Sequence, residues 1–197
     1  MLLFLHWGHF FIGFLFLISL MLQKDMGYSA ASAGLMLVPF SILSALMAKF
    51  ILPHISKRLN SSQMGVLGWL FMLTGGLLLL ISVYVGHPLA VVLLGAACIS
   101  GIGMTFCFTA LSVLGIQDVE PANYGLASSL SSTSYFLGAG IGLSFMTLMS
   151  QIFPSEFSVG SLNIVILIGY AVVALGILFY FILKSLKMEQ AKIAVSS

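Results

Sequence analysis

The chain has 197 residues, of which 60% are hydrophobic and 6% carry a charge. A chain of this length with so few charged side chains lacks the polar surface that a water-soluble globule needs, whereas a lipid bilayer demands no such cover. The composition therefore excludes a soluble protein and makes the bilayer the first expected partner. A net charge of +2 gives no reason to expect nucleic acid as a partner.

Six apolar stretches of about twenty residues follow one another along the chain. A membrane-spanning segment must satisfy its backbone hydrogen bonds internally, so continuous apolar runs predict α-helices rather than the alternating strands of a barrel. We expect an all-α polytopic membrane protein, a single transmembrane bundle over residues 1–197 with a short tail at 184–197. The expected helices are residues 2–22, 30–52, 63–85, 89–116, 126–150 and 161–183.

The basic residues predict the orientation of these helices. With the amino terminus in the cytoplasm, six of the seven Lys and Arg side chains fall on the cytoplasmic side and Lys24 alone lies outside. The positive-inside rule favours this threading over its reverse. We therefore expect a multi-pass protein of the plasma (cytoplasmic) membrane with both termini in the cytoplasm, and with Lys57 and Arg58 in a cytoplasmic loop.

Small residues are densest in the fourth and fifth expected helices. Gly101 and Gly103 lie in the fourth, and Gly138 and Gly142 lie in the fifth. Because lipid provides no hydrophobic force between helices, close backbone approach through small residues is a main source of packing energy. These four glycines are therefore predicted to mark sites of helix packing.

The first and fourth expected helices carry the candidate substrate-contacting residues. His9, Gly13 and Phe16 fall on one stripe of the first helix by their spacing, and Gln23 is the polar candidate at its end. In the fourth helix, Met104 and Phe108 offer the adaptable and flat apolar surface that suits promiscuous recognition of apolar or cationic molecules. Such side chains are also common where a helix faces lipid, and that interpretation stays open.

The apolar stretches show no arrangement typical of an enzyme or a metal centre. They contain no carboxylate at membrane depth, no zinc or redox spacing, and no pair of nucleophile and base. We expect no enzymatic activity, no metal and no cofactor. A proton-driven cycle would have to draw its intramembrane carboxylate from protein outside this chain.

Several short motifs occur in the order that one transporter family shows. They are the runs 20–23 (LMLQ), 27–29 (GYS), 33–35 (AGL) with Pro39, 101–104 (GIGM), 120–121 (EP), 125–128 (GLAS) and 137–142 (LGAGIG). Over essentially its whole length the chain resembles the carboxy-terminal half of multidrug exporters of the major facilitator superfamily, specifically the fourteen-helix drug:proton antiporters of EmrB/QacA type.

This resemblance implies two six-helix bundles, each an inverted pair of three-helix repeats, with a substrate path between them. It implies that the first and fourth helices line the central cavity, that the second and fifth face the other bundle, and that the third and sixth face lipid. The loop with Lys57 and Arg58 stands where the family has a motif rich in Gly, Asp and Arg. This chain departs from that motif around Pro53 and His54.

The expected function is therefore that of one part of a secondary active transporter, which exports drugs or other amphipathic small molecules and is coupled to protons. We expect the chain to be a fragment that needs an amino-terminal transporter half, or a second copy of itself, because a path between two bundles requires both. The alternative is a non-transporting membrane scaffold or assembly subunit.

Overall fold

The computed structural model describes residues 2–117 and 119–152, together with residues 164, 165, 168, 169, 172, 175, 176 and 179. All secondary structure assigned in this part of the chain is helical, so the predicted all-α class is confirmed there. Most of the sixth expected helix, 161–183, and the whole tail, 184–197, lie outside the described residues.

The described residues form five long helical rods, two of which contain π-helical stretches in the middle. The first is α1, Leu2–Leu20, which ends in a π-helical turn, Met21–Asp25. The second joins α2, Ala30–Leu46, through the π-helical stretch Met47–Ile51 to α3, Leu52–Ile55. The third rod is α4, Ser61–Tyr84. The fourth joins α5, Leu89–Ala96, through the π-helical stretch Ala97–Gly103 to α6, Met104–Ile116. The fifth is α7, Tyr124–Ile152, which follows a short 3-10 turn at Pro121–Asn123.

Capping side chains move the helix boundaries away from those expected on hydrophobicity alone. The third rod begins at Ser61 rather than residue 63, because Asn60 and Gln63 form a reciprocal capping box. The Gln63 N–H donates to Asn60 Oδ1 at 2.9 Å, and the Asn60 N–H donates to Gln63 Oε1 at 3.1 Å. These bonds satisfy backbone donors that have no partner inside the helix, so polar residues extend an apolar helix.

Four described rods are long and apolar enough to cross a membrane, namely Leu3–Asp25, Ala30–Ile55, Ser61–Tyr84 and Leu89–Ile116. The fifth, α7, is 29 residues long but is not among these four. Its hydroxyl side chains lower its apolar character, yet Thr133 and Thr147 each donate to the carbonyl four residues earlier at 2.8 Å. A hydroxyl satisfied in this way is tolerated in a membrane helix, and the crossing of α7 stays a prediction.

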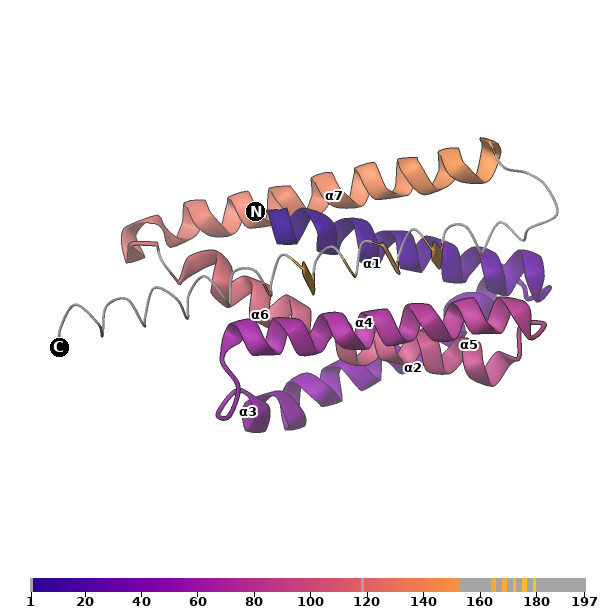
Figure 1. Ribbon diagram of the computed structural model, residues 1–197, viewed down its shortest axis with the longest axis horizontal. Helices are drawn as coiled ribbons and strands as arrows, with labels where there is room; N and C mark the ends of the chain where they lie inside the picture. Colours follow the sequence, from indigo (N-terminus) through magenta and orange to yellow (C-terminus); the bar gives the residue numbers. More distant parts are fainter. Residues whose placement is uncertain are drawn as a thin grey trace.

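The helices pack mainly as two close pairs, with α1 along α7 and α4 along the rod of α5 and α6 (Figure 1). In the first pair, Gly138 faces the Leu5 carbonyl and Gly8 faces the Tyr135 carbonyl so closely that neither position has room for a Cβ atom. At Gly142 a Cβ atom would lie 2.7 Å from the His9 ring. The backbones of α1 and α7 therefore touch at several levels, as expected where small residues drive helix association.

The second pair uses glycines on both helices. A Cβ atom at Gly75 of α4 would lie 2.7 Å from the carbonyl oxygen of Gly95, and one at Gly103 would lie 3.1 Å from the carbonyl oxygen of Gly68. Gly101 serves a different neighbour, because a Cβ atom there would meet the Leu43 side chain of α2 at 2.5 Å. The π-helical stretch Ala97–Gly103 thus contacts α4 and α2 at once.

Helix α2 is attached to this assembly over a small area. In its membrane-spanning window only 6% of the residues are buried, against 39% or more in the other three rods. Its link to the fourth rod includes a hydrogen bond between Ser44 Oγ and Thr105 Oγ1 at 2.8 Å, and Thr105 also donates to the Gly101 carbonyl at 2.9 Å. Most of the α2 surface is therefore left for lipid or for another protein.

The glycine contacts predict a sharp difference between two neighbouring positions of α7. Gly138→Ala should destabilise the folded chain by about 1 to 3 kcal/mol, because the added methyl group forces α1 and α7 apart. Gly140→Ala is the matched control, since nothing lies within 4 Å of a Cβ atom there, and the better helix propensity of alanine should leave stability unchanged or raised. Thermal unfolding of both variants in the same detergent measures this difference, and equal melting temperatures would contradict it.

Candidate functional site

An aromatic cluster joins α1, α6 and α7 near the amino-terminal end of α1. The Trp7 ring contacts Phe108 of α6 and Tyr135 of α7, with centroid distances of 5.6 Å and 4.7 Å. Two further rings of α1, Phe4 and Phe11, lie 6.4 Å and 6.1 Å from Trp7. All these distances fall in the range at which aromatic pairs attract one another.

The cluster follows directly from the contact between α1 and α7. Phe4, Trp7 and Phe11 are three or four residues apart and share one face of α1. Gly8 beside Trp7 lets the Tyr135 backbone approach closely, which brings the Tyr135 ring onto the Trp7 ring. Trp7 itself is 3% exposed, whereas Phe108 is 53% exposed. The cluster is therefore closed around Trp7 and open at Phe108.

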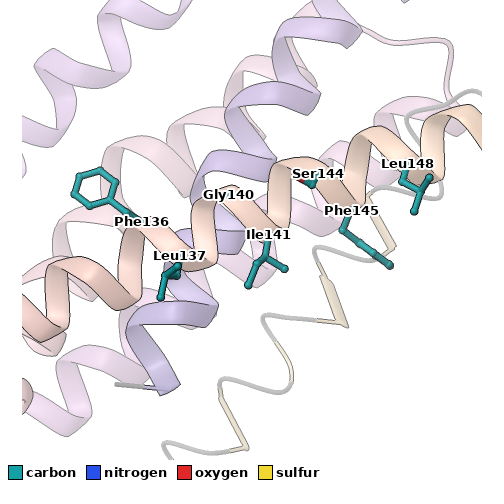
Figure 2. A pocket seen from close by; sticks show the side chains of 7 residues that line it. All are labelled: Phe136, Leu137, Gly140, Ile141, Ser144, Phe145 and Leu148. Carbon is teal, nitrogen blue, oxygen red and sulfur yellow. The ribbon is translucent and has the colours of Figure 1, made fainter.

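The outer face of α7 carries a shallow groove whose lining is almost entirely apolar. Figure 2 shows the side chains of Leu137, Ile141 and Phe145 on the same side of the helix, and nothing lies within 4 Å of the position that a Cβ atom would take at Gly140. The lining residues are Phe136, Leu137, Gly140, Ile141, Ser144, Phe145 and Leu148. A groove of this kind offers contact area to an apolar molecule and a single hydroxyl to a polar one.

The candidate stripe on α1 lies partly inside the helix packing. His9 is 1% exposed, its ring faces Gly142, and its centroid lies 6.3 Å from the Phe145 ring of the groove. Gly13 is also buried, whereas Phe16 is half-buried. His9 therefore contacts α7 at Gly142 and at the groove residue Phe145. Because α7 packs directly over it, His9 does not form an open cavity wall with the rest of the stripe.

The other candidates lie at separate places. Gln23 is in the π-helical turn that ends α1, where its amide donates to Ser19 Oγ at 2.7 Å and to the Ser19 carbonyl at 3.1 Å. Met104 is half-buried at the start of α6, one turn before the exposed Phe108. The structure thus brings Phe108 to Trp7 and His9 to Phe145, but it does not gather all six candidates into one pocket.

Sequence reasoning missed Trp7, Tyr135 and the groove of α7. A signal for the groove was present, because Phe136, Gly140, Ser144 and Leu148 recur every four residues and so share one helix face. No comparable signal marks Tyr135, which contacts Trp7 from a distant part of the chain.

The polar features of the described residues lie at the helix ends. Lys57 and Arg58 are exposed in the connection between α3 and α4. The connections after α1 and α4 meet through His87 and Asp25, whose Nε2 and Oδ2 atoms are 3.7 Å apart. Within the described part of the chain, no three His, Cys, Asp or Glu side chains are grouped so that they could hold a metal ion.

Residues 1–143 match the sequence profile of the Major Facilitator Superfamily, and the chain therefore belongs to this superfamily. With its apolar membrane-length helices it is a multi-pass membrane protein. No solved structure matches the chain significantly.

Among the relatives that it matches, one is named as a multidrug resistance protein, one as an efflux pump and one as an export protein. It is 29% identical over 134 residues to the multidrug resistance protein Stp of Mycobacterium tuberculosis, a stretch covering 68% of this chain and 24% of that protein. It is 29% identical over 150 residues to the multidrug efflux pump LfrA of Mycolicibacterium smegmatis, covering 75% and 29%. It is 30% identical over 135 residues to the cephamycin export protein CmcT of Amycolatopsis lactamdurans, covering 66% and 27%. The matched stretch thus spans about a quarter of the length of these relatives.

The contact of Phe108 with Trp7 predicts that two equally exposed phenylalanines differ in their contribution to stability. Phe108→Ala should lower the free energy of unfolding by about 1 kcal/mol more than Phe50→Ala does, because only Phe108 packs on a buried ring. The matched control is apt because Phe50 is 54% exposed and Phe108 is 53% exposed. Unfolding in mixed micelles measures both variants, and equal losses would refute the packing role.

Proposed function

We propose that this chain forms one six-helix half of a secondary active transporter that exports drugs or other amphipathic small molecules at the expense of a proton gradient. It acts together with an amino-terminal half of the type found in fourteen-helix drug:proton antiporters, or with a second copy of itself. The observation that carries this proposal is the match of residues 1–143 to the superfamily, together with relatives named as a multidrug resistance protein, an efflux pump and an export protein.

The helix pairings support an inverted arrangement of two three-helix repeats. In such an arrangement the first helix corresponds to the fourth, the second to the fifth, and the third to the sixth. A contact between the first and fifth helices then requires an equivalent contact between the fourth and second. Both occur, because α1 packs along α7 and α2 packs on the Ala97–Gly103 stretch of the fourth rod.

The surfaces of α2 and α7 support a partner for this bundle. Large apolar side chains of α2 are exposed, as are those that line the groove of α7. A second bundle facing these two helices would cover them and leave a path between the bundles. The aromatic cluster at Phe108 and the groove of α7 are the surfaces that would meet an amphipathic substrate.

Proton coupling in this proposal depends on the partner. The described carboxylates, Asp25 and Glu120, lie at or beyond the ends of the membrane-length rods. A carboxylate near the bilayer centre is the usual proton carrier, since it is costly there and is kept only for function. The second half of the transporter supplies this group.

Transport is tested by expressing the chain in a host that lacks its own pumps. If the partner is an amino-terminal half, the chain alone should give no efflux of a lipophilic cationic dye, because half of the path is missing. If the partner is a second copy, efflux by the chain alone should accompany a dimer. Coexpression with the amino-terminal half of one of the relatives should restore efflux, and a protonophore should abolish it. Efflux by the chain as a monomer would refute the proposal, and capture of a partner without any flux would favour the scaffold alternative.

The orientation is tested with single cysteines in a chain whose Cys98 and Cys107 are replaced by alanine. In intact cells a membrane-impermeant maleimide should label His87→Cys, whereas Lys57→Cys should react only after the membrane is permeabilised. The reason is that the threading with most basic residues in the cytoplasm puts the two loops on opposite sides. Labelling of position 57 in intact cells would overturn this topology.

A further inference from the structure

The indole nitrogen of Trp7 is buried and has no hydrogen-bond partner. Trp7 is 3% exposed, and its Nε1–H finds no acceptor among the residues that the structure describes. Because the Trp7 side chain is enclosed by its neighbours, water has little access to this donor, and leaving it unpaired costs free energy. An orphaned donor in a native structure calls for a specific explanation, and a ligand that provides the acceptor is one.

A second orphaned donor lies at the same junction of helices. The Ser131 hydroxyl of α7 is buried and also lacks a partner. A Cβ atom at Gly115 of α6 would lie 3.1 Å from Ser131 Oγ and 3.3 Å from the Phe4 ring, which in turn contacts Trp7. The Ser131 hydroxyl therefore lies on the Phe4 side of the same aromatic cluster.

The surroundings of Trp7 differ from those of the other tryptophan. Trp69 also has an unpaired Nε1–H, but it is completely buried, and its ring neighbour Phe10 is completely buried as well. Trp7 instead borders Phe108, which is 53% exposed. Phe108 therefore gives the cluster around Trp7 an exposed edge, whereas the ring that contacts Trp69 in the described part of the chain is buried.

We propose that the Trp7 N–H is a specificity-determining donor, which binds an acceptor oxygen of the exported molecule at the junction of α1, α6 and α7. The ligand is a flat aromatic compound with a carbonyl-type oxygen. Its rings pack on Phe108, the exposed ring of the cluster, and its oxygen accepts a hydrogen bond from the Trp7 N–H when the Phe108 side chain moves aside. This inference rests on the proposed function only in naming the ligand as a substrate, because the binding itself needs no transport.

The chemistry of the cluster selects this class of ligand. The rings around Trp7 lie 4.7 Å to 6.4 Å away and are tilted, stacked or edge-on, an environment that favours another flat ring. A site built to donate a hydrogen bond discriminates against an analogue that lacks the acceptor, since the donor is then left unpaired. The distinguishing property of a ligand is therefore its oxygen.

A matched pair of probes tests this distinction directly. Fluorenone and fluorene have the same three-ring frame and differ in the carbonyl oxygen. Equilibrium dialysis against the full chain in lipid nanodiscs, corrected for empty nanodiscs, should show about tenfold tighter binding of fluorenone. Trp7→Phe, which keeps the ring and removes the N–H, should bring the ratio close to one, whereas the matched control Trp69→Phe should leave it unchanged. An equal ratio in all three proteins would overturn the proposal.

A measurement on the unaltered chain guards against misfolding of the Trp7 variant. The chain has two tryptophans, so a proton–nitrogen correlation spectrum of the labelled protein contains two indole signals. Fluorenone should move the Trp7 signal downfield and leave the Trp69 signal in place, and fluorene should move neither strongly. A Trp7 signal that is already hydrogen-bonded to trapped water, or that ignores fluorenone, would refute the role of the donor. Dye efflux is not measured here, so failure of this test is separate from failure of the transport proposal.

Discussion

The contact between the backbones of α1 and α7 is the constraint on which the rest of the described structure depends. Lipid tails are as apolar as leucine side chains, so helices in a bilayer gain little free energy when such side chains move from lipid into a helix contact. They gain by dense packing, and the densest packing needs positions without a Cβ atom. Gly8 of α1 provides such a position against the Tyr135 carbonyl, and Gly138 of α7 provides one against the Leu5 carbonyl. The pairing of α4 with the fourth rod repeats this solution at Gly75 and Gly95.

The same contact creates the candidate site. Once Gly8 admits the backbone of α7, Tyr135 lies against Trp7, and the exposed Phe108 of α6 contacts the Trp7 ring as well. Helix packing and ligand recognition therefore use adjacent residues of α1. The burial that stabilises the cluster also leaves the Trp7 N–H without an acceptor in the described part of the chain. This unpaired donor costs free energy on folding, and it is the group that we propose to bind the ligand.

Hydrophobicity alone was enough to locate the described rods and to name the helical class, because a membrane helix must be both long and apolar. The expected stretch 89–116 coincides with Leu89–Ile116, whereas the second rod runs on to Ile55 and the third begins at Ser61. Those differences arise from capping and from π-helical stretches, which depend on local hydrogen bonds rather than on hydropathy. Nor could spacing along α1 reveal that His9 is covered, because its cover comes from Gly142.

Two kinds of information thus have different sources. The sequence by itself determined that the chain is a helical membrane protein with a transporter's motifs. It also determined where glycines, which have no Cβ atom to keep neighbours away, occur along each helix. These properties belong to each segment separately. Only the tertiary structure decided which backbone each glycine meets, that Trp7, Phe108 and Tyr135 share one junction, and that two buried donors stay unpaired there. The physical reason is that contact and burial belong to pairs of helices, and the choice of partner depends on packing across distant parts of the chain.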